Sequence, residues 1–188
     1  KGMDMLKDIR GMFAFVIYDK NKNTLYAVRD FFGIKPFYYT NINGNLIFGS
    51  EIKSFLEYPD FKKEVNELAL ENYLSFQYSV LEETFFKGVF KLMPGHYLKY
   101  KDGKVDITRY FEPMFKPQPM KLQEAIKAVD HCLQESIKIH KVSDVEVGSF
   151  LSSGVDSSYV AATFKGDKTF TVGFDYQNYN EINYAKDL

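Results

Sequence analysis

The sequence predicts an α+β fold for its first half and the beginning of an α/β fold with a parallel sheet for its second half. Short apolar runs separated by Asn, Gly and Asp turns predict antiparallel hairpins up to residue 112. A proline-rich stretch at residues 113–120 interrupts the periodic pattern. Helix, strand, turn, helix and strand then follow one another, which is typical of parallel sheets. We therefore expect a first domain at 1–112, a linker at 113–120 and a second domain at 121–188.

Three hairpins and one helix are expected in the first half. Asn43-Gly44 is among the strongest short turn signals, and it separates two apolar runs. A helix is expected over residues 67–76, with Asn66 as its N-cap, because apolar side chains recur there at helical spacing. The expected hairpins pair residues 11–19 with 24–30, 37–40 with 46–48, and 97–100 with 105–111.

Composition narrows the class of protein. The chain has 188 residues, of which 45% are hydrophobic and 26% charged, as in a globular protein with a substantial core. A net charge of -1 offers no basic field for nucleic acid, and no apolar run approaches the length of a membrane span. The single cysteine, Cys132, excludes an intrachain disulfide and agrees with a cytoplasmic location. The three histidines lack metal-ligand spacing and are expected to be structural.

The second half is expected to alternate helices and strands. A long amphipathic helix is predicted to start at Leu122, and a strand is predicted over residues 168–174. The tail, residues 178–188, reads as a further helix with Asn180 as cap and Glu181 in its first turn. Steps of three and four residues place one apolar face of the long helix on Leu122, Ile126, Val129, Leu133, Ile137 and His140.

Residues 145–164 carry the most informative pattern, V-E-V-G-S-F-L-S-S-G-V-D-S-S-Y-V-A-A-T-F. A buried strand is predicted over residues 145–151, a small-residue turn over 152–157, and a helix beyond it with Ser157 as N-cap. A strand, a tight turn and a helix in succession direct unpaired backbone N–H groups at an anion. The crossover to the next strand would place Val172 and Gly173 beside the same sheet edge.

The chemistry of the turn favours phosphate together with a cation. Val155 stands where a Walker A loop would need lysine, and no G-x-G-x-x-G pattern is present. Hydroxyl and N–H groups suit phosphate oxygens, whereas a carboxylate beside them needs a cation between. Asp156 is therefore predicted to bind Mg²⁺. The residues expected to bind phosphate are Ser152, Ser153, Gly154, Val155 and Ser157.

Two segments resemble a known family. The turn L-S-S-G-V-D-S-S resembles the S-G-G-x-D-S pyrophosphate loop of ATP-dependent amide-forming enzymes. Residues 29–39, R-D-F-F-G-I-K-P-F-Y-Y, resemble the R-D-x-x-G-x-x-P-L-Y-Y signature of class II glutamine amidotransferase domains. The runs G-M-F-A-F-V-I-Y-D, F-G-S-E-I-K-S-F and F-K-G-V-F-K-L-M-P-G-H-Y-L resemble neighbours of that signature. Together they resemble the family of glutamine-hydrolysing asparagine synthetases.

The resemblance implies a fold and an activity. It implies part of an N-terminal-nucleophile-type glutaminase sheet followed by part of an ATP-pyrophosphatase-like domain. The implied enzyme takes ammonia from glutamine and forms asparagine from aspartate and ATP through an aspartyl-adenylate, releasing AMP and pyrophosphate. ATP and Mg²⁺ are the implied cofactors, a homodimer is a possible assembly, and Leu151 and Val172 match positions that contact the nucleotide.

The chain departs from the family in two respects. Glutaminases of this class use an N-terminal cysteine as nucleophile and its α-amine as base. This sequence starts at Lys1 and its cysteine, Cys132, lies in the other half, so we expect an internal fragment without catalytic residues. Ser153 stands where the family usually has glycine, and we predict a negative φ there, because positive φ would strain a serine.

Other functions stay open at this point. A related amide-forming ligase, of the β-lactam or lasso-peptide cyclase type, would share both halves. A module that binds nucleotide without catalysis would share the turn alone. A tRNA-modifying or nucleotide-synthesising ATPase with the same loop is disfavoured by the first half. Within the signature at 29–39, Arg29 and Asp30 can also be explained as groups that satisfy the backbone of a structured loop.

Overall fold

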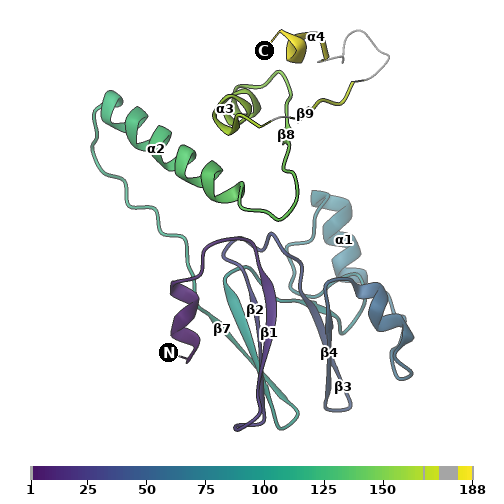
Figure 1. Cartoon of the computed structure of the whole chain (residues 1–188). Coiled ribbons are helices and arrows are strands. Elements are labelled where there is room, and N and C mark those ends of the chain that lie inside the picture. The colour runs from purple at the N-terminus through teal and green to yellow at the C-terminus, as the bar shows by residue number, and fades with distance from the viewer. Residues whose placement is uncertain (1, 167, 174–181, 188) are drawn as a thin grey trace. The chain divides into compact units, whose positions relative to one another are not determined.

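The computed structural model describes residues 2–166, 168–173 and 182–187 (Figure 1). The chain divides into two compact units, residues 1–115 and 116–188. The boundary between them falls inside the stretch 113–120, where three prolines interrupt the periodic pattern. Among the described residues, no helix is both long and apolar enough to cross a membrane.

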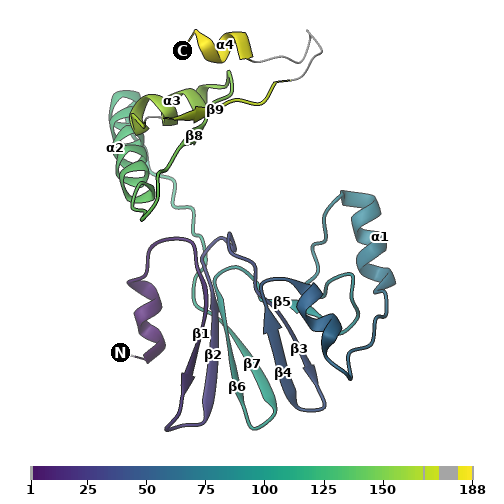
Figure 2. The same cartoon turned by 45° about the vertical axis from the view of Figure 1, so that its right-hand side comes forward.

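A four-stranded antiparallel sheet with the order β1-β2-β6-β7 forms one part of the first unit (Figure 2). Two hairpins build it, and both were expected from the alternating apolar pattern. β2 and β6 join the hairpins, with Ala27 opposite Leu98. The strands are β1 (Ala14–Asp19), β2 (Thr24–Arg29), β6 (His96–Lys101) and β7 (Lys104–Arg109).

A three-stranded antiparallel sheet with the order β4-β3-β5 forms the other part. β3 (Tyr38–Ile42) and β4 (Asn45–Gly49) are joined by Asn43-Gly44, and both turn residues have positive φ, as the predicted hairpin requires. β5 (Phe90–Lys91) pairs with β3 only at Tyr38 and Tyr39. Within the described part of the chain, one edge of β3 therefore has no strand partner beyond Tyr39.

The core of the first unit draws on both sheets. Its buried members are Ala27, Phe37, Tyr39, Leu92 and Leu98. Each large apolar side chain buried there contributes about 1.5–3 kcal/mol relative to an exposed one. The two hairpin systems are therefore held together by a shared apolar layer, as expected for an α+β unit.

Helical segments complete the first unit. Helix α1 (Glu67–Phe76) begins as predicted, because the Asn66 side chain accepts a hydrogen bond from the Ala69 N–H at 3.2 Å. It ends at Gln77, which adopts the left-handed conformation. Two 3₁₀ helices, η1 (Gly2–Lys7) and η2 (Ile52–Glu57), were not predicted.

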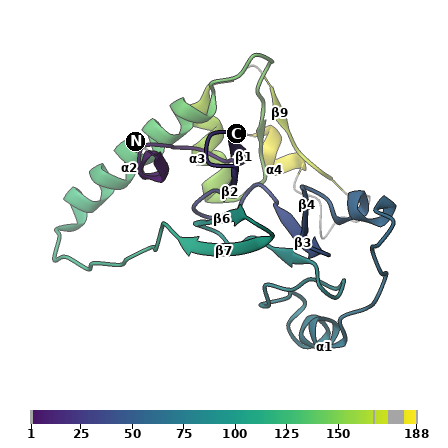
Figure 3. The ribbon, with the colours of Figure 1, turned by 90° about the horizontal axis from the view of Figure 1, so that it is seen from below.

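The second unit begins with α2 (Leu122–His140), a continuous helix of 19 residues with the predicted bounds (Figures 1 and 3). α3 (Val155–Phe164) packs against it. β8 (Ser149–Phe150) and β9 (Thr169–Phe170) pair in parallel, which confirms the expected direction of these strands. A short helix, α4 (Ile182–Lys186), follows.

The strands of the second unit are shorter than predicted. The expected buried strand at 145–151 is reduced to two residues, and Val145 and Phe150 are 77% and 78% exposed. Among the described residues these two strands form a sheet of only two strands, and an isolated two-stranded pair is marginally stable. β9 likewise covers two residues of the expected 168–174. The predicted cap Asn180 and the acidic Glu181 lie outside the described residues.

Candidate functional site

The serine-rich turn lies where β8 gives way to α3. The Leu151 N–H donates to the Phe170 carbonyl at 2.9 Å, and the chain then leaves the sheet. The Thr171 hydroxyl donates to the Leu151 carbonyl at 2.8 Å, which joins the two strand ends. Because Phe150 pairs with Phe170, Ser152 and Val172 occupy matching positions beyond those ends. The parallel pairing thus brings Leu151, the turn and residues 172–173 to one edge.

Ser157 lies inside the helix and is not its N-cap, so that prediction was wrong. The helix begins after Gly154, three residues earlier, and Ser157 is the third helical residue. From there its hydroxyl reaches back into the turn. It accepts a hydrogen bond from the Ser152 N–H at 3.1 Å, lies 2.8 Å from the Ser152 Oγ, and donates to the Ser152 carbonyl at 2.9 Å. Side-chain hydroxyls therefore hold the turn closed.

The amide groups of the turn fall into two sets. The Ser152 amide donates to the Ser157 hydroxyl at 3.1 Å, and the Gly154 amide donates to the Ser152 hydroxyl at 3.3 Å. The first recorded helical bond runs from the Ser158 N–H to the Gly154 carbonyl at 3.1 Å. Over the described part of the chain, no recorded hydrogen bond uses the amides of Ser153 or of residues 155–157. These N–H groups, at the positive end of the helix dipole, are available to an anion.

The backbone at Ser153 agrees with the prediction made from its departure from glycine. Among the described non-glycine residues, positive φ occurs at five positions, and Ser153 is not one of them. Gly154 also has a negative φ, -77°. A serine at position 153 is therefore accommodated without strain.

Asp156 is exposed and borders two grooves between α2 and α3, of about 610 and 480 Å³. Both grooves are lined mainly by apolar side chains, including Leu133 and Val160, and Val129 lines the larger one. No cluster of three potential metal ligands occurs within residues 2–166, 168–173 and 182–187. A cation at Asp156 would therefore share its coordination with phosphate oxygens, and the metal role of Asp156 stays a prediction.

A hydrogen-bonded carboxylate links the two helices beside Asp156. The Tyr159 hydroxyl, on α3, donates to Asp130 on α2, and the Gln134 amide donates to the same carboxylate at 2.8 Å. These two bonds lower the pKa of Asp130, and the bond to Asp130 raises the pKa of Tyr159. Sequence reasoning missed this link, because 29 residues separate its members and no local pattern connects them.

In the signature at residues 29–39, Arg29 and Asp30 satisfy the backbone groups of a structured loop, which was one of its two interpretations. The Arg29 guanidinium donates to three carbonyls, those of Lys35 at 2.8 Å, Leu92 at 2.6 Å and Gly33 at 2.7 Å. Gly33 has φ +66°, and a Cβ there would lie 2.7 Å from the Pro94 ring. The arginine thus joins the loop to the segment before β6.

Asp30 supports the same loop from inside. It is 1% exposed, and its carboxylate accepts hydrogen bonds from the N–H groups of Phe13, Phe32, Ile34 and Lys35. Burial opposes ionisation, but the four backbone donors outweigh it and lower the pKa of Asp30. The Arg29 guanidinium and the Asp30 carboxylate are therefore both hydrogen-bonded to backbone groups.

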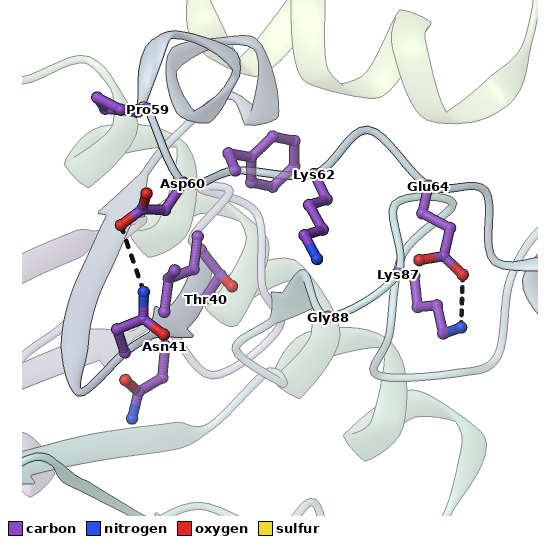
Figure 4. Close-up of a pocket in the computed structure, with 11 residues that line it drawn as sticks. Thr40, Asn41, Pro59, Asp60, Lys62, Glu64, Lys87 and Gly88 are labelled. Atoms are coloured by element: carbon purple, nitrogen blue, oxygen red, sulfur yellow. Dashed lines mark hydrogen bonds and ion pairs between the residues drawn. The ribbon is translucent and has the colours of Figure 1, made fainter.

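A polar hollow of about 690 Å³ lies elsewhere in the first unit (Figure 4). It is formed by the second half of β3, the segment after η2 and the turn before β5. No sequence motif pointed to it, because its walls come from three separate segments. The lining residues are Thr40, Asn41, Ile42, Asn43, Pro59, Asp60, Phe61, Lys62, Glu64, Lys87 and Gly88.

Comparison with known proteins gives the family. The model of the glutamine amidotransferase domain matches residues 1–111, which is more than half of the chain. The chain belongs to the glutamine amidotransferase domain family. The asparagine synthase model matches residues 128–188, which include the serine-rich turn. The order of the two matches agrees with the two halves expected from the sequence.

Relatives carry both parts as well. The chain is 41% identical over 184 residues to asparagine synthetase [glutamine-hydrolyzing] 1 of Bacillus subtilis, covering 95% of this chain and 29% of that protein. It is 34% identical over 196 residues to a putative asparagine synthetase of Methanocaldococcus jannaschii, covering 98% and 38% respectively. It is also 34% identical over 165 residues to amidase chyE of Penicillium rubens, covering 85% and 24%. The chain thus spans well under half of the length of these relatives.

Proposed function

We propose that the chain forms part of an ATP-dependent, glutamine-hydrolysing asparagine synthetase. The observation that carries the proposal is the turn at 152–157. It presents unpaired amides at the carboxyl edge of two parallel strands, within the segment that the asparagine synthase model matches. Ligands bind at this edge in open α/β sheets. The relatives support asparagine, formed from aspartate with ammonia from glutamine, as the product.

In this proposal the first unit contributes scaffold to a glutaminase of the N-terminal-nucleophile type. Its antiparallel sheets and saturated signature loop are consistent with that role. The second unit would then be the beginning of an ATP-pyrophosphatase-like domain. The division into domains at 1–112 and 121–188, with a linker between, belongs to the same proposal.

The proposed chemistry assigns a role to each part of the edge. The residues proposed to hold the departing pyrophosphate are Ser152, Ser153, Gly154, Val155 and Ser157. Ser153, Val155 and Ser157 would contribute the amides that have no recorded partner among the described residues. There they would stabilise the charge that grows when the substrate carboxylate attacks the α-phosphorus. Mg²⁺, when bound at Asp156, supplies charge neutralisation for the phosphates. Leu151, Val172 and Gly173 would face adenine and ribose.

The first test is a comparison of Asp156→Asn with Asp144→Asn, which removes a charge from an exposed residue outside the turn. Titration of the 188-residue chain with magnesium pyrophosphate should show at least a tenfold loss of affinity for Asp156→Asn and none for Asp144→Asn. In an enzyme assembled like the relatives, Asp156→Asn should abolish ATP–pyrophosphate exchange while glutamine hydrolysis continues. Unchanged exchange would refute the role.

A second candidate is a related amide-forming ligase with an acceptor other than aspartate, of the β-lactam or lasso-peptide cyclase type. The similarity to amidase chyE supports it, because a protein that is not named an asparagine synthetase shares 34% identity over 85% of this chain. Release of AMP and pyrophosphate with amino acids other than aspartate would separate this candidate from asparagine synthesis. A nucleotide-binding module without catalysis would bind ATP and release neither product.

Location and assembly follow from the same family argument. A cytoplasmic location and a homodimer both stay predictions. Sedimentation of the purified protein would test the homodimer, and fractionation of the host cell would test the location.

A further inference from the structure

The polar hollow of the first unit exists because β3 extends beyond the two residues that pair with β5. β5 pairs with β3 only at Tyr38 and Tyr39, whereas β3 continues to Ile42. The segment before β5 turns away at Lys87 and Gly88, and these residues form the opposite wall of the hollow (Figure 4). The hollow is therefore bounded by a stretch of strand edge, and all of its lining residues belong to the first unit.

The strand edge presents one free donor and one free acceptor. The Leu92 N–H donates to the Phe37 carbonyl at 2.9 Å, so Phe37 directs its polar groups toward the β5 side. Residues two and four positions along a strand point the same way, which gives Asn41 that orientation. The residue that could pair with Asn41, Gly88, instead donates its N–H to the Glu83 carboxylate at 2.6 Å. The N–H and C=O of Asn41 therefore face the hollow, and no strand among the described residues pairs with them.

The charged side chains of the hollow differ in the ion pairs and hydrogen bonds that they make. Lys87 and Glu64 form an ion pair at 2.6 Å. Asp60 accepts one hydrogen bond, from the Asn43 amide at 3.3 Å, through one oxygen. Lys62 extends into the hollow in Figure 4, and the ion pairs recorded among the described residues do not include it. Among the described residues, one ammonium group and one carboxylate oxygen of the lining are thus available to a ligand in the hollow.

We propose that this hollow binds a free α-amino acid in its zwitterionic form. The carboxylate of the ligand would meet the Lys62 ammonium and the Asn41 N–H, and its ammonium would meet Asp60 and the Asn41 carbonyl. The four charged side chains sum to zero, so the hollow has no net charge that would attract a simple anion or a simple cation. Both ends of the ligand remain near solvent, so the dissociation constant is expected on the order of millimolar.

Three probes separate the two ends of the ligand. Glycine carries both charges, N-acetylglycine keeps only the carboxylate, and glycinamide keeps only the ammonium. Each is titrated into the 188-residue chain while backbone amide resonances are followed by NMR. Glycine should cause saturable shifts at residues 40–43 and at Lys62, with an affinity at least fivefold higher than that of the other two probes.

Matched lysine variants test the assignment. Lys62→Met should weaken glycine binding at least fivefold, and Asp60→Asn should do the same. Lys63→Met removes the same charge from the next residue, which does not line the hollow, and should leave binding unchanged. Lys62 and Lys63 are both exposed, so the variants keep the fold, which the dispersion of their spectra would verify.

Several outcomes would overturn the proposal. Equal binding of N-acetylglycine and glycine would mean that the hollow recognises a carboxylate alone, as at a peptide terminus. Equal loss in Lys62→Met and Lys63→Met would indicate only general charge attraction. Shifts that do not saturate, or that lie away from residues 40–43, would show that the hollow is not an amino-acid site.

Discussion

Two loops of this chain carry charged or polar signatures, and they differ in whether their polar groups find partners within the protein. The loop after β2 buries Asp30 and joins Arg29 to three carbonyls, so its polar groups are saturated from within the protein. The turn after β8 is exposed, and part of its backbone amides have no recorded partner among the described residues. A saturated loop stabilises a fold, whereas an unsaturated one can bind a ligand. The composition of the two loops alone would not have separated these roles.

The largest expected effect is in the saturated loop. Asp30→Ala would leave four backbone N–H groups without their acceptor, and all four hydrogen bonds are partly buried. We expect the free energy of unfolding of the first unit to fall by about 3 kcal/mol or more. Urea denaturation measures it. Asp106→Ala, at an exposed site in β7, is the control and should change the value little. A loss as small as that of the control would contradict the role of Asp30.

Acid should lower the same free energy of unfolding, because it protonates Asp30. The pKa of Asp30 is lowered in the folded protein, so the unfolded chain binds a proton at this residue first as the pH falls. The stabilisation is present above the ordinary aspartate pKa of about 3.9 and disappears as the pH falls through the lower folded value. A carboxyl resonance of Asp30 titrating below that ordinary value would check the sign, and one titrating above it would reverse the argument.

A smaller effect is expected where the saturated loop turns back on itself. Gly33→Ala would place a Cβ 2.7 Å from the Pro94 ring at φ +66°, which should destabilise the unit by about 1–3 kcal/mol. Gly44→Ala is the matched control. Gly44 also has positive φ, +78°, but nothing lies within 4 Å of its Cβ position, so only the backbone cost of about 1 kcal/mol remains. Equal losses would show that the contact with Pro94 is unimportant.

The smallest effect on stability is expected in the exposed turn. Ser157→Ala would remove the hydroxyl that holds Ser152, and it should lower the free energy of unfolding by only about 0.5–1.5 kcal/mol. The affinity for magnesium pyrophosphate should fall about fivefold, because the turn would lose its closed shape. Ser158→Ala is the control, since that hydroxyl donates to the Gly154 carbonyl at 2.7 Å and lies outside the Ser152–Ser157 pair. An unchanged affinity of Ser157→Ala in calorimetric titration would contradict the role of the Ser157 hydroxyl in shaping the turn.

Local patterns predicted elements well where neighbours in the sequence are also neighbours in space. The three hairpins, α1 with its Asn66 cap and α2 were all confirmed. The turn after β8 was correctly placed between a strand and a helix, but its helix starts three residues earlier than expected. Ser157 is a good N-cap residue by type, yet the helix begins directly after Gly154, and the Ser157 hydroxyl instead bonds backward to Ser152.

Features built from distant segments could not be predicted. The link between Asp130 and Tyr159, the saturation of Asp30 by Phe13, and the hollow beside β3 each join residues that no local period relates. The short length of β8 also depended on its neighbours, because a strand persists only where another strand pairs with it.

The sequence by itself determined where the three hairpins, α1 and α2 form, and which residue types stand at the serine-rich turn, because periodicity and turn chemistry act over a few residues. Only the tertiary structure decided which of the polar groups remain free. That outcome depends on which donors and acceptors meet across the fold, and a hydrogen bond between distant segments leaves no trace in the local order of residues.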